Sequence, residues 1–353
     1  MNPCPIELIG CGALTEQVYA PVLAYLEKTG RVKVVSLVDP NAGRRTQIAK
    51  VFPSARLAAQ LEELPATPGA LAVIASPPNL HVTQACALLE AGRHVLCEKP
   101  LALSAAEAET MIAVAQRTGQ LLAAGMMRRF YPSTQALREN LLAGTFGEPK
   151  RVEIIEGGRF GWNAASPRFF EPSNGGVLFD LGSHVLDLLC HCFAEPSTSE
   201  SQNDALGGSN TNCVLSAHWP NNLTARVRLS WDVANLPTGW RIHTTRGECR
   251  WNGASDGALM FRPHGGKWWL SAAVQVTPQS TEIKAISSWT AAFVRQFDNV
   301  LGAIKGENSL LAPAGDVLPS LRWLEKARSQ AGILPQLWLS AEEQTRATQL
   351  AQS

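Results

Sequence analysis

Residues 6–17 read IELIGCGALTEQ, an apolar run that ends on a glycine and is followed by a second glycine and a helical pattern. Such a stretch is typical of a first β-strand, a tight turn and the start of a helix. Gly10 permits the tight turn, and Gly12 lets the backbone approach a pyrophosphate at the helix N-terminus. Thr15 replaces the third glycine of the G-x-G-x-x-G pattern, so the surrounding sequence must support the motif. The turn residues predicted to contact a dinucleotide are Gly10, Gly12, Ala13 and Leu14.

Apolar runs alternate with helical patterns over about the first 125 residues. The last of these helical patterns begins at Ser104, with Glu107 three residues later as in a capping box, and ends at Gly119. Strands of continuous apolar character separated by helices predict a parallel sheet with helices on both faces. The predicted strands are 6–10, 33–39, 71–76, 94–100 and 121–127, and the predicted helices run up to Lys28 and over 41–52, 79–92 and 104–119.

A different pattern begins at about residue 130, where alternating apolar and polar residues predict antiparallel strands. The loop 157–176 is rich in Gly, Pro and aromatic residues, and 197–212 is interpreted as an edge strand with a loop. The predicted strands are 150–157, 213–219, 223–231, 240–245 and 249–253, and the predicted helices are 133–143, 177–193, 289–304 and 314–331. A chain of 353 residues is long enough for two domains. We expect an α/β dinucleotide-binding domain over 1–127 and a substrate-binding α+β domain over 128–353, with a cleft between them.

The composition argues against several classes of protein. The formal net charge is +1, which provides no basic field for nucleic acid. No apolar run approaches the ~20 residues of a membrane span, and the start of the sequence, MNPCPIELIGCGAL, lacks the pattern of a signal peptide. The eight cysteines lie mostly in apolar segments, as expected for reduced thiols. We therefore expect a cytoplasmic protein with no nucleic-acid or membrane partner.

An acidic residue ends the second predicted strand. A carboxylate at Asp39 accepts hydrogen bonds from the hydroxyls of an adenosine ribose and repels a 2′-phosphate, which favours NAD. Asp39 lies further from Gly12 than the usual ~20 residues, because the first helix is long. Two alternatives stay open: Asp39 caps the next helix, or Arg44 or Arg45 binds the 2′-phosphate of NADP.

Polar residues also follow the third and fourth predicted strands, at the edge where a cofactor lies across a parallel sheet. In ASPPNLHV (75–82), the candidates to line the dinucleotide are Ser76, Pro77, Asn79 and His81, and the alternative for each is a turn or cap residue. In VLCEKPLALS (95–104), Glu98 and Lys99 end a buried strand. Glu98 either holds Lys99 in place or contacts the nicotinamide ribose.

Lys99 is the stronger candidate for chemistry. An ammonium group beside the nicotinamide stabilises negative charge that grows on a substrate oxygen during hydride transfer. Pro100 fixes the backbone, and a cis Lys99–Pro100 bond would aim the lysine side chain. The alternative is a surface Glu–Lys pair at the end of a strand.

The stretch GGVLFDLGSHVLDLLCHCF (175–193) predicts an amphipathic helix. At about 100° per residue, Asp180, His184, Asp187 and His191 fall on one face. Asp180 and His184 are i, i+4 neighbours, so the carboxylate can orient the imidazole as a general base that takes a hydroxyl proton. For Asp187 and His191 we favour structural hydrogen bonds. The opposite, apolar face is formed by Val177, Leu178, Leu181, Val185, Leu188 and Leu189.

A metal site is the alternative for this helix. The pattern D-x3-H-x2-D-x3-H presents metal-binding groups, and CHC at 190–192 adds two thiols. The remaining ligands have no evident source, and neighbouring helix positions face apart. We therefore predict no metal.

Together, GCGALTEQ, the strand-end acid at 39, SPPNLH, CEKPL and GGVLFDLGSHVLDLL resemble the glucose–fructose oxidoreductase / inositol dehydrogenase (Gfo/Idh/MocA) family over nearly the whole chain. The resemblance implies an N-terminal Rossmann domain, which is a doubly wound parallel sheet, and a C-terminal α+β domain with a largely antiparallel, open-faced sheet. That sheet commonly forms the subunit interface, so the resemblance also implies a homodimer or homotetramer. Members oxidise or reduce hydroxyl or keto groups of sugars, inositols and sugar derivatives with NAD(P).

Several residue roles follow from the same resemblance. Lys99 matches the family's active-site lysine, and Asp180 and His184 match its D-x3-H pair, in which the histidine transfers the proton. The loop 159–176 is expected to cover the nicotinamide and the substrate. The candidate substrate contacts are Trp162 and Arg168 in this loop and Arg128 and Arg129 after the fifth strand. An arginine at the latter positions binds a carboxylate or phosphate in bidentate fashion, or it pairs with a surface acid.

The sequence therefore predicts an NAD-dependent dehydrogenase or ketoreductase acting on a sugar-like polyol. One alternative is an enzyme without net redox change, such as a glycosidase or an epimerase that works through a transient ketone; net reduction of added NAD distinguishes the two. Another alternative is a catalytically silent NAD-binding regulatory protein. Its expected sign is the loss of Lys99, Asp180 or His184, and the sequence contains all three.

Overall fold

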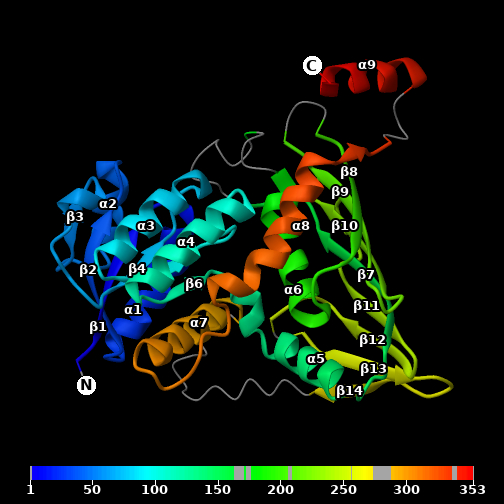
Figure 1. Cartoon of the computed structure of the whole chain (residues 1–353), viewed down its shortest axis with the longest axis horizontal. Helices are drawn as coiled ribbons and strands as arrows, with labels where there is room; N and C mark the ends of the chain where they lie inside the picture. The colour runs from blue at the N-terminus through cyan, green and yellow to red at the C-terminus, as the bar shows by residue number, and fades with distance from the viewer. Residues whose placement is uncertain are drawn as a thin grey trace. The chain divides into compact units, whose positions relative to one another are not determined.

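The computed structural model describes all residues except 1, 163–170, 172–175, 206–208, 256, 273–287, 336–339 and 353. By its internal contacts the chain divides into two units (Figure 1). The first consists of Met1–Phe130 and Glu282–Leu321, and the second of Tyr131–Thr281 and Arg322–Ser353. A segment from far along the chain therefore returns to the first unit. The division into domains at residue 127 stays a prediction.

The first unit is built on a parallel sheet of six strands in its described residues. The strand order is β3-β2-β1-β4-β5-β6, and the neighbouring pairs are parallel. This order is that of a Rossmann fold, in which the cofactor lies at the carboxyl ends of the strands, so the predicted sheet is confirmed. The short edge strand β3 is an addition that the apolar pattern did not indicate. The strands are β1 Cys4–Ile9, β2 Val32–Val38, β3 Arg56–Ala58, β4 Leu71–Ile74, β5 His94–Cys97 and β6 Leu122–Ala124.

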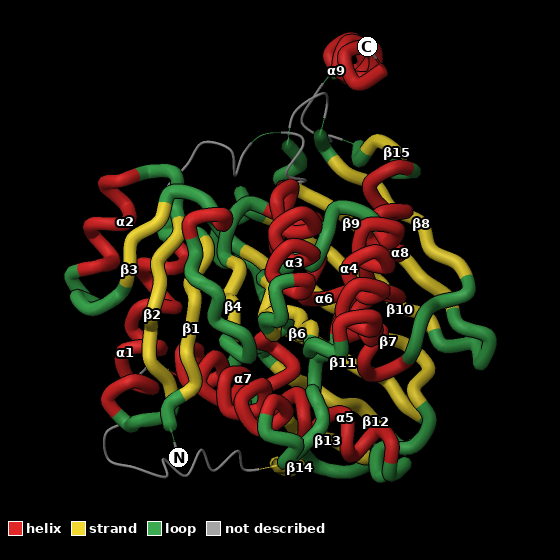
Figure 2. Tube along the Cα trace, turned by 60° about the vertical axis from the view of Figure 1, so that its left-hand side comes forward, coloured by secondary structure: helices red, strands yellow, loops and turns green. Residues whose placement is uncertain are grey.

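Helices pack against this sheet, with α3 beside α4 and α1 beside α7 (Figure 2). The predicted ends of α4 are confirmed: the Ser104 hydroxyl accepts a hydrogen bond from the Glu107 backbone N–H at 3.3 Å, and Gly119 is left-handed with φ 68°. The Glu107 carboxylate closes the cap by accepting from the Leu103 N–H at 2.9 Å. The helices are α1 Ala20–Lys28, α2 Ala42–Ala49, α3 His81–Glu90, α4 Ala105–Thr118 and α7 Ser288–Ile304.

The second unit is built on a mixed sheet, with nine strands in its described residues. The order is β14-β13-β12-β11-β7-β10-β9-β8-β15, and only the β7–β10 and β8–β15 pairs are parallel among those described. The predicted, largely antiparallel sheet is confirmed. The strands are β7 Pro149–Gly157, β8 Thr198–Asn203, β9 Asn212–His218, β10 Thr224–Ser230, β11 Gly239–Thr244, β12 Gly247–Trp251, β13 Leu259–Pro263, β14 Trp269–Ala272 and β15 Gly332–Ile333.

One face of this second sheet is covered and the other is open. Along β7, Val152, Ile154 and Glu156 are buried, whereas Glu153 and Ile155 between them are not. The helices α5 and α6 lie on the covered side (Figure 1). The predicted open face is therefore confirmed. The helices of this unit are α5 Pro132–Leu142, α6 Ser183–Phe193, α9 Ala341–Gln352 and most of α8 Leu318–Ser329.

Two further features bear on the sequence-based expectations. Within the described residues, no helix is both long and apolar enough to cross a membrane. None of the eight cysteines, which all lie in the described parts of the chain, takes part in a disulfide. Burial raises the pKa of several of them, to about 12 for Cys11, Cys213 and Cys249, so these groups are thiols at neutral pH.

Candidate active site

The glycine turn has the geometry that its sequence requires. Gly10 has φ 96°, and a Cβ atom there would lie 2.8 Å from the backbone of Ala75 and Ser76, so only glycine fits. A Cβ atom on Gly12 would meet nothing within 4 Å, which leaves the backbone accessible to a ligand. Thr15, in place of the third glycine, is buried and donates its hydroxyl to the Gly10 carbonyl at 2.5 Å. Thr15 therefore stabilises the turn by a hydrogen bond from the helix that follows it.

Asp39, at the end of β2, is bound to this turn. One carboxylate oxygen accepts a hydrogen bond from the backbone N–H of Cys11 at 2.8 Å, and the other accepts from Asn41 N–H at 2.8 Å. The N-cap of α2 is Asn41, whose side chain accepts from the Arg44 N–H at 3.1 Å. The Arg45 guanidinium donates to the Asp39 carbonyl. Asp39 thus joins the strand to the glycine turn, and Asn41 rather than Asp39 caps the next helix.

The residues after β4 divide into surface and buried positions. Pro77 and Asn79 are exposed, and the hydroxyl of the half-buried Ser76 donates to Gln84 at 2.5 Å. His81 is fully buried, with one ring nitrogen 3.0 Å from the Pro100 carbonyl and the other 2.9 Å from the Ser76 carbonyl. Burial lowers the pKa of His81, and its contacts with backbone carbonyls oppose this shift. Its contacts tie together the turns that follow β4 and β5.

Glu98 and Lys99 follow β5 at the same edge of the sheet. Lys99 is half-buried, whereas Glu98 is only 5% exposed. One oxygen of the Glu98 carboxylate accepts from the Tyr19 hydroxyl at 2.5 Å, and the other accepts from the Lys99 backbone N–H at 2.9 Å. Of the two predicted roles for Glu98, this geometry favours holding Lys99 over contacting the ribose. The Lys99–Pro100 bond is cis, which confirms that prediction.

The helix that carries Asp180 and His184 begins with a π-helical turn, Leu178–Gly182, before α6. The predicted apolar face is confirmed for five of its residues, whereas Leu181 is half-buried. Asp187, predicted to share the polar face, is 1% exposed and buried among them. Leu186 and Leu188 beside it are also buried, so the buried side of α6 is wider than the predicted apolar face. Asp180, His184 and His191 are half-buried.

The predicted substrate contacts receive different environments. Arg129 is 1% exposed and donates to the carbonyls of Leu311 and Asp316, both at 3.2 Å, and its guanidinium lies 3.9 Å from the Asp316 carboxylate. The contact with Asp316 matches the alternative of a pair with a surface acid. Arg128 and Trp162 are half-buried. Arg168 lies outside the described residues.

The candidate site residues thus fall into two sets. The first unit brings the glycine turn, Asp39, Glu98 and Lys99 to the carboxyl edge of its sheet. The second unit carries Asp180 and His184 on one short stretch of helix. Sequence reasoning missed Tyr19, because no motif marks a tyrosine inside the first helix. It also missed Gly125, where a Cβ atom would lie 2.9 Å from the Glu98 Cα. Among the described residues, no group of three or more His, Cys, Asp or Glu is arranged to hold a metal.

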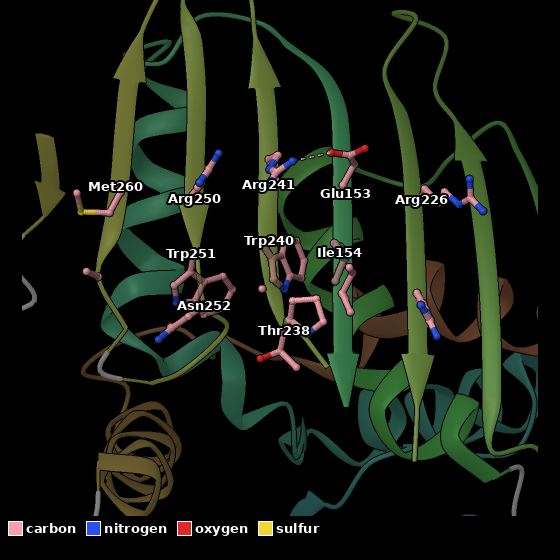
Figure 3. Close-up of a pocket in the computed structure, with 15 residues that line it drawn as sticks. Glu153, Ile154, Arg226, Thr238, Trp240, Arg241, Arg250, Trp251, Asn252 and Met260 are labelled. Atoms are coloured by element: carbon pink, nitrogen blue, oxygen red, sulfur yellow. Dashed lines mark ion pairs between the residues drawn. The ribbon is translucent and has the colours of Figure 1, made fainter. Parts of the chain in front are cut away.

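A separate pocket of about 770 Å³ lies at the second sheet (Figure 3). Strands β7 and β10–β13 line it, and none of the predicted site residues does. Arg241 points toward Glu153 in Figure 3, with 3.9 Å between guanidinium and carboxylate. On the neighbouring strand, Glu248 pairs with Arg250 at 2.7 Å and with Arg262 at 3.1 Å. Burial tends to raise the pKa of Glu248, but the hydrogen bond from Arg250 and the charges of Arg250, Arg241 and His243 outweigh it and lower the pKa, so the carboxylate stays ionised.

Comparison with known families matches both parts of the chain. The family described as "Oxidoreductase family, NAD-binding Rossmann fold" (GFO_IDH_MocA) matches residues 5–126. The "GFO/IDH/MocA C-terminal domain" matches residues 134–250.

Curated relatives and solved structures agree with these matches. The chain is 29% identical to D-glucoside 3-dehydrogenase of Escherichia coli over 201 residues, 56% of each chain. It is 27% identical to scyllo-inositol 2-dehydrogenase (NADP(+)) IolW of Bacillus subtilis over 198 residues, 54% of this chain and 52% of the relative. It therefore spans about half the length of these relatives. The WlbA dehydrogenase of Bordetella pertussis, solved with NADH and UDP-GlcNAcA, superposes with a TM-score of 0.78 at 20% identity, covering 95% of this chain and 99% of that one, which shows a shared fold.

Proposed function

The chain belongs to the Gfo/Idh/MocA family of NAD(P)-dependent oxidoreductases, and on that premise we propose that it transfers a hydride between the nicotinamide and a hydroxyl or keto carbon of a sugar, inositol or sugar derivative. D-glucoside 3-dehydrogenase and scyllo-inositol 2-dehydrogenase, two of its relatives, support this substrate class. The observation that carries the proposal is the setting of Lys99. Lys99 lies between Glu98, which is bound by the buried Tyr19, and Pro100, whose carbonyl contacts the buried His81. These contacts lie at the edge of the sheet where the glycine turn is found.

The first unit fits a dinucleotide. The accessible backbone at Gly12 and the start of the first helix provide N–H groups for a pyrophosphate. Asp39 holds its carboxylate next to this turn, where a ribose diol is recognised and a 2′-phosphate is repelled, so we propose NAD as the preferred cofactor. Arg44 and Arg45 are the residues that would favour NADP instead.

In the proposed mechanism the bound nicotinamide supplies the position that gives or accepts the hydride. Lys99 stabilises the negative charge on the substrate oxygen. His184 takes the hydroxyl proton during oxidation and returns it during reduction, and Asp180 orients the imidazole. Two observations support the second assignment: both side chains are half-buried rather than fully exposed, and they lie one turn apart on the helix that matches the family's D-x3-H pair. Trp162, Arg128 and Arg168 are proposed to contact the substrate.

We further propose a cytoplasmic homodimer or homotetramer that assembles through the open face of the second sheet. The face presents arginine and glutamate side chains in alternation across β7, β11 and β12, an arrangement that can pair with a second copy. Arginine is among the residues enriched at protein interfaces.

A substrate panel tests the proposed reaction. The purified protein is incubated with NAD or NADP and a series of sugars, alkyl glucosides and inositols, and with NADH or NADPH and their keto forms, while the absorbance of the reduced nicotinamide is followed. We expect net turnover with at least one polyol and its ketone, and a preference for NAD. Cofactor binding without turnover of any compound in either direction would contradict a dehydrogenase and favour the regulatory alternative.

A further inference from the structure

We propose that Tyr19 is a positioning residue for Lys99 and that it acts through the buried carboxylate of Glu98. The proposal rests on the role given above to Lys99, and it extends the site to a residue on the helix that follows the glycine turn. Tyr19 does not touch the substrate or cofactor in this proposal. It holds the Glu98 carboxylate in place, and this carboxylate holds the backbone of Lys99.

The contacts form a short chain from the helix to the lysine backbone. The Tyr19 hydroxyl donates to one oxygen of Glu98 at 2.5 Å, and the other oxygen accepts from the Lys99 N–H at 2.9 Å. Tyr19 is fully buried and Glu98 is 5% exposed, so water does not compete for these bonds. With one donor on each oxygen, rotation of the carboxylate would break both bonds. The peptide that carries Lys99 is therefore held in one orientation.

The surroundings leave Tyr19 and Glu98 little freedom. The Tyr19 ring meets Phe293 and Phe297 of α7 edge to face, with centroids 5.7 and 6.0 Å away. On the other side, a Cβ atom on Gly125 would lie 3.1 Å from the Glu98 Cδ, so only a glycine leaves room for the carboxylate in this position. The Tyr19 side chain and the backbone of Lys99 and Gly125 thus surround one carboxylate that is almost entirely shielded from solvent.

The electrostatics agree with this geometry. Burial raises the pKa of Glu98, and the hydrogen bonds from Tyr19 and from the Lys99 N–H, together with the Lys99 charge, oppose that rise. Burial, the Glu98 charge and the Tyr19–Glu98 hydrogen bond raise the pKa of Tyr19 well above its ordinary range, so the phenol keeps its proton and donates. The other ionisable neighbour is Cys97, whose pKa burial also raises, so it stays a neutral thiol. Removing the Tyr19 hydroxyl therefore favours the protonated form of Glu98.

The test compares Tyr19→Phe with Tyr25→Phe. Tyr19 ends the π-helical turn and Tyr25 lies in α1, which continues it, so each substitution removes one hydroxyl from one helical stretch. The Tyr25 ring lies under the Arg31 guanidinium, at 5.1 Å. The reaction to follow is reduction of the best keto substrate from the panel with NADH. In this direction His184 acts as an imidazolium, which low pH favours, so His184 does not cause a loss of rate at low pH. Asp180 is the same in every variant compared, so a change of the acid limb between them reports Glu98.

We expect Tyr19→Phe to lower kcat at neutral pH about tenfold or more, with little change in the KM for NADH. The acid limb of its pH profile should move to higher pH, since a carboxylate with one donor fewer takes up a proton more easily. Tyr25→Phe should match the wild type in both measurements. Thermal unfolding should show that Tyr19→Phe is folded, because the ring and its packing are kept.

Lys99→Met separates failure of this proposal from failure of the proposed function. If Lys99→Met is inactive but Tyr19→Phe keeps the wild-type kcat and acid limb, Tyr19 is not a positioning residue and the role of Lys99 stands. If Lys99→Met keeps its turnover, both proposals fall. Should Tyr19→Phe not fold, Glu98→Gln gives the answer. It removes the charge and the titration of this side chain and leaves one acceptor oxygen, so kcat should fall and the part of the acid limb that Glu98 contributes should disappear. A wild-type kcat and pH profile would overturn the proposal.

Discussion

Lys99 is the single residue on which the proposed chemistry depends most. Lys99→Met keeps an unbranched apolar stem but removes the charge that stabilises the substrate oxygen. We expect kcat to fall by about 10²–10³-fold, with the Kd for NAD nearly unchanged, because the glycine turn and Asp39 are untouched. Stopped-time assays of turnover measure kcat, and quenching of the protein fluorescence by NAD measures the Kd. Lys50→Met, at an exposed lysine after α2, is the matched control, and a Lys99 variant as active as this control removes the lysine from the mechanism.

Residues of the site differ in how far the sequence could predict them. Gly10, Asp39 and Lys99 could be placed because each ends a strand of a recognisable alternation, where position follows from topology. The Tyr19–Glu98 bond spans 79 positions, and the His81–Pro100 contact joins two turns. Neither contact can be predicted from the spacing of residues in the sequence, since the partners come together only when the sheet and its helices pack.

Among the helices, two π-helical turns in the described residues deserve comparison: Thr15–Tyr19 after the glycine turn and Leu178–Gly182 before α6. Such turns are frequent at functional sites. One ends on the proposed positioning residue Tyr19, and the other carries Asp180. A regular period of 3.6 residues predicted both helices but not the turns, because i→i+5 bonding changes the register without changing the apolar composition.

The helix α6 provides a test of proton transfer. In polyol oxidation a neutral imidazole takes the proton, so the rate should rise with pH as His184 loses its charge and level off above that range. We expect His184→Ala to be at least 10²-fold slower and to lack this rise. His191→Ala, at a half-buried histidine of the same helix to which we assign a structural role, should keep the wild-type pH dependence. An unchanged profile in His184→Ala would move the general base to another residue.

Strands and helices with strong local signals were predicted well, and those without them were not. The capped helix α4 begins and ends where its sequence indicates. By contrast, β13 and β14 are short strands, of which β13 pairs with β12 and β14 pairs with β13, and α9 has polar or small residues at nearly every position. Their formation depends on neighbours and not on their own pattern, which is why the sequence did not indicate them.

For the whole molecule, the open face of the second sheet makes a prediction about assembly. We expect light scattering to give the mass of a dimer or tetramer. Ile155→Glu places an additional charge in the middle of the open face, next to Arg228 of β10, and should weaken assembly at least tenfold by disturbing the interface. Leu142→Glu, at a 68% exposed position at the end of α5, is the control and should leave the mass unchanged. A monomeric wild type, or an Ile155→Glu variant of unchanged mass, would contradict assembly through this face.

The return of the chain to the first unit has a consequence for biosynthesis. Phe293 and Phe297 of α7 close over Tyr19, and the Ala124 N–H at the end of β6 donates to the Ala312 carbonyl at 2.9 Å. On a translating ribosome the first sheet emerges long before these partners are made. Until they arrive, the nascent sheet shows an uncovered apolar flank and an unpaired strand edge, which are the features that molecular chaperones recognise. Completion of the dinucleotide-binding unit therefore has to wait until the second sheet has also been synthesised.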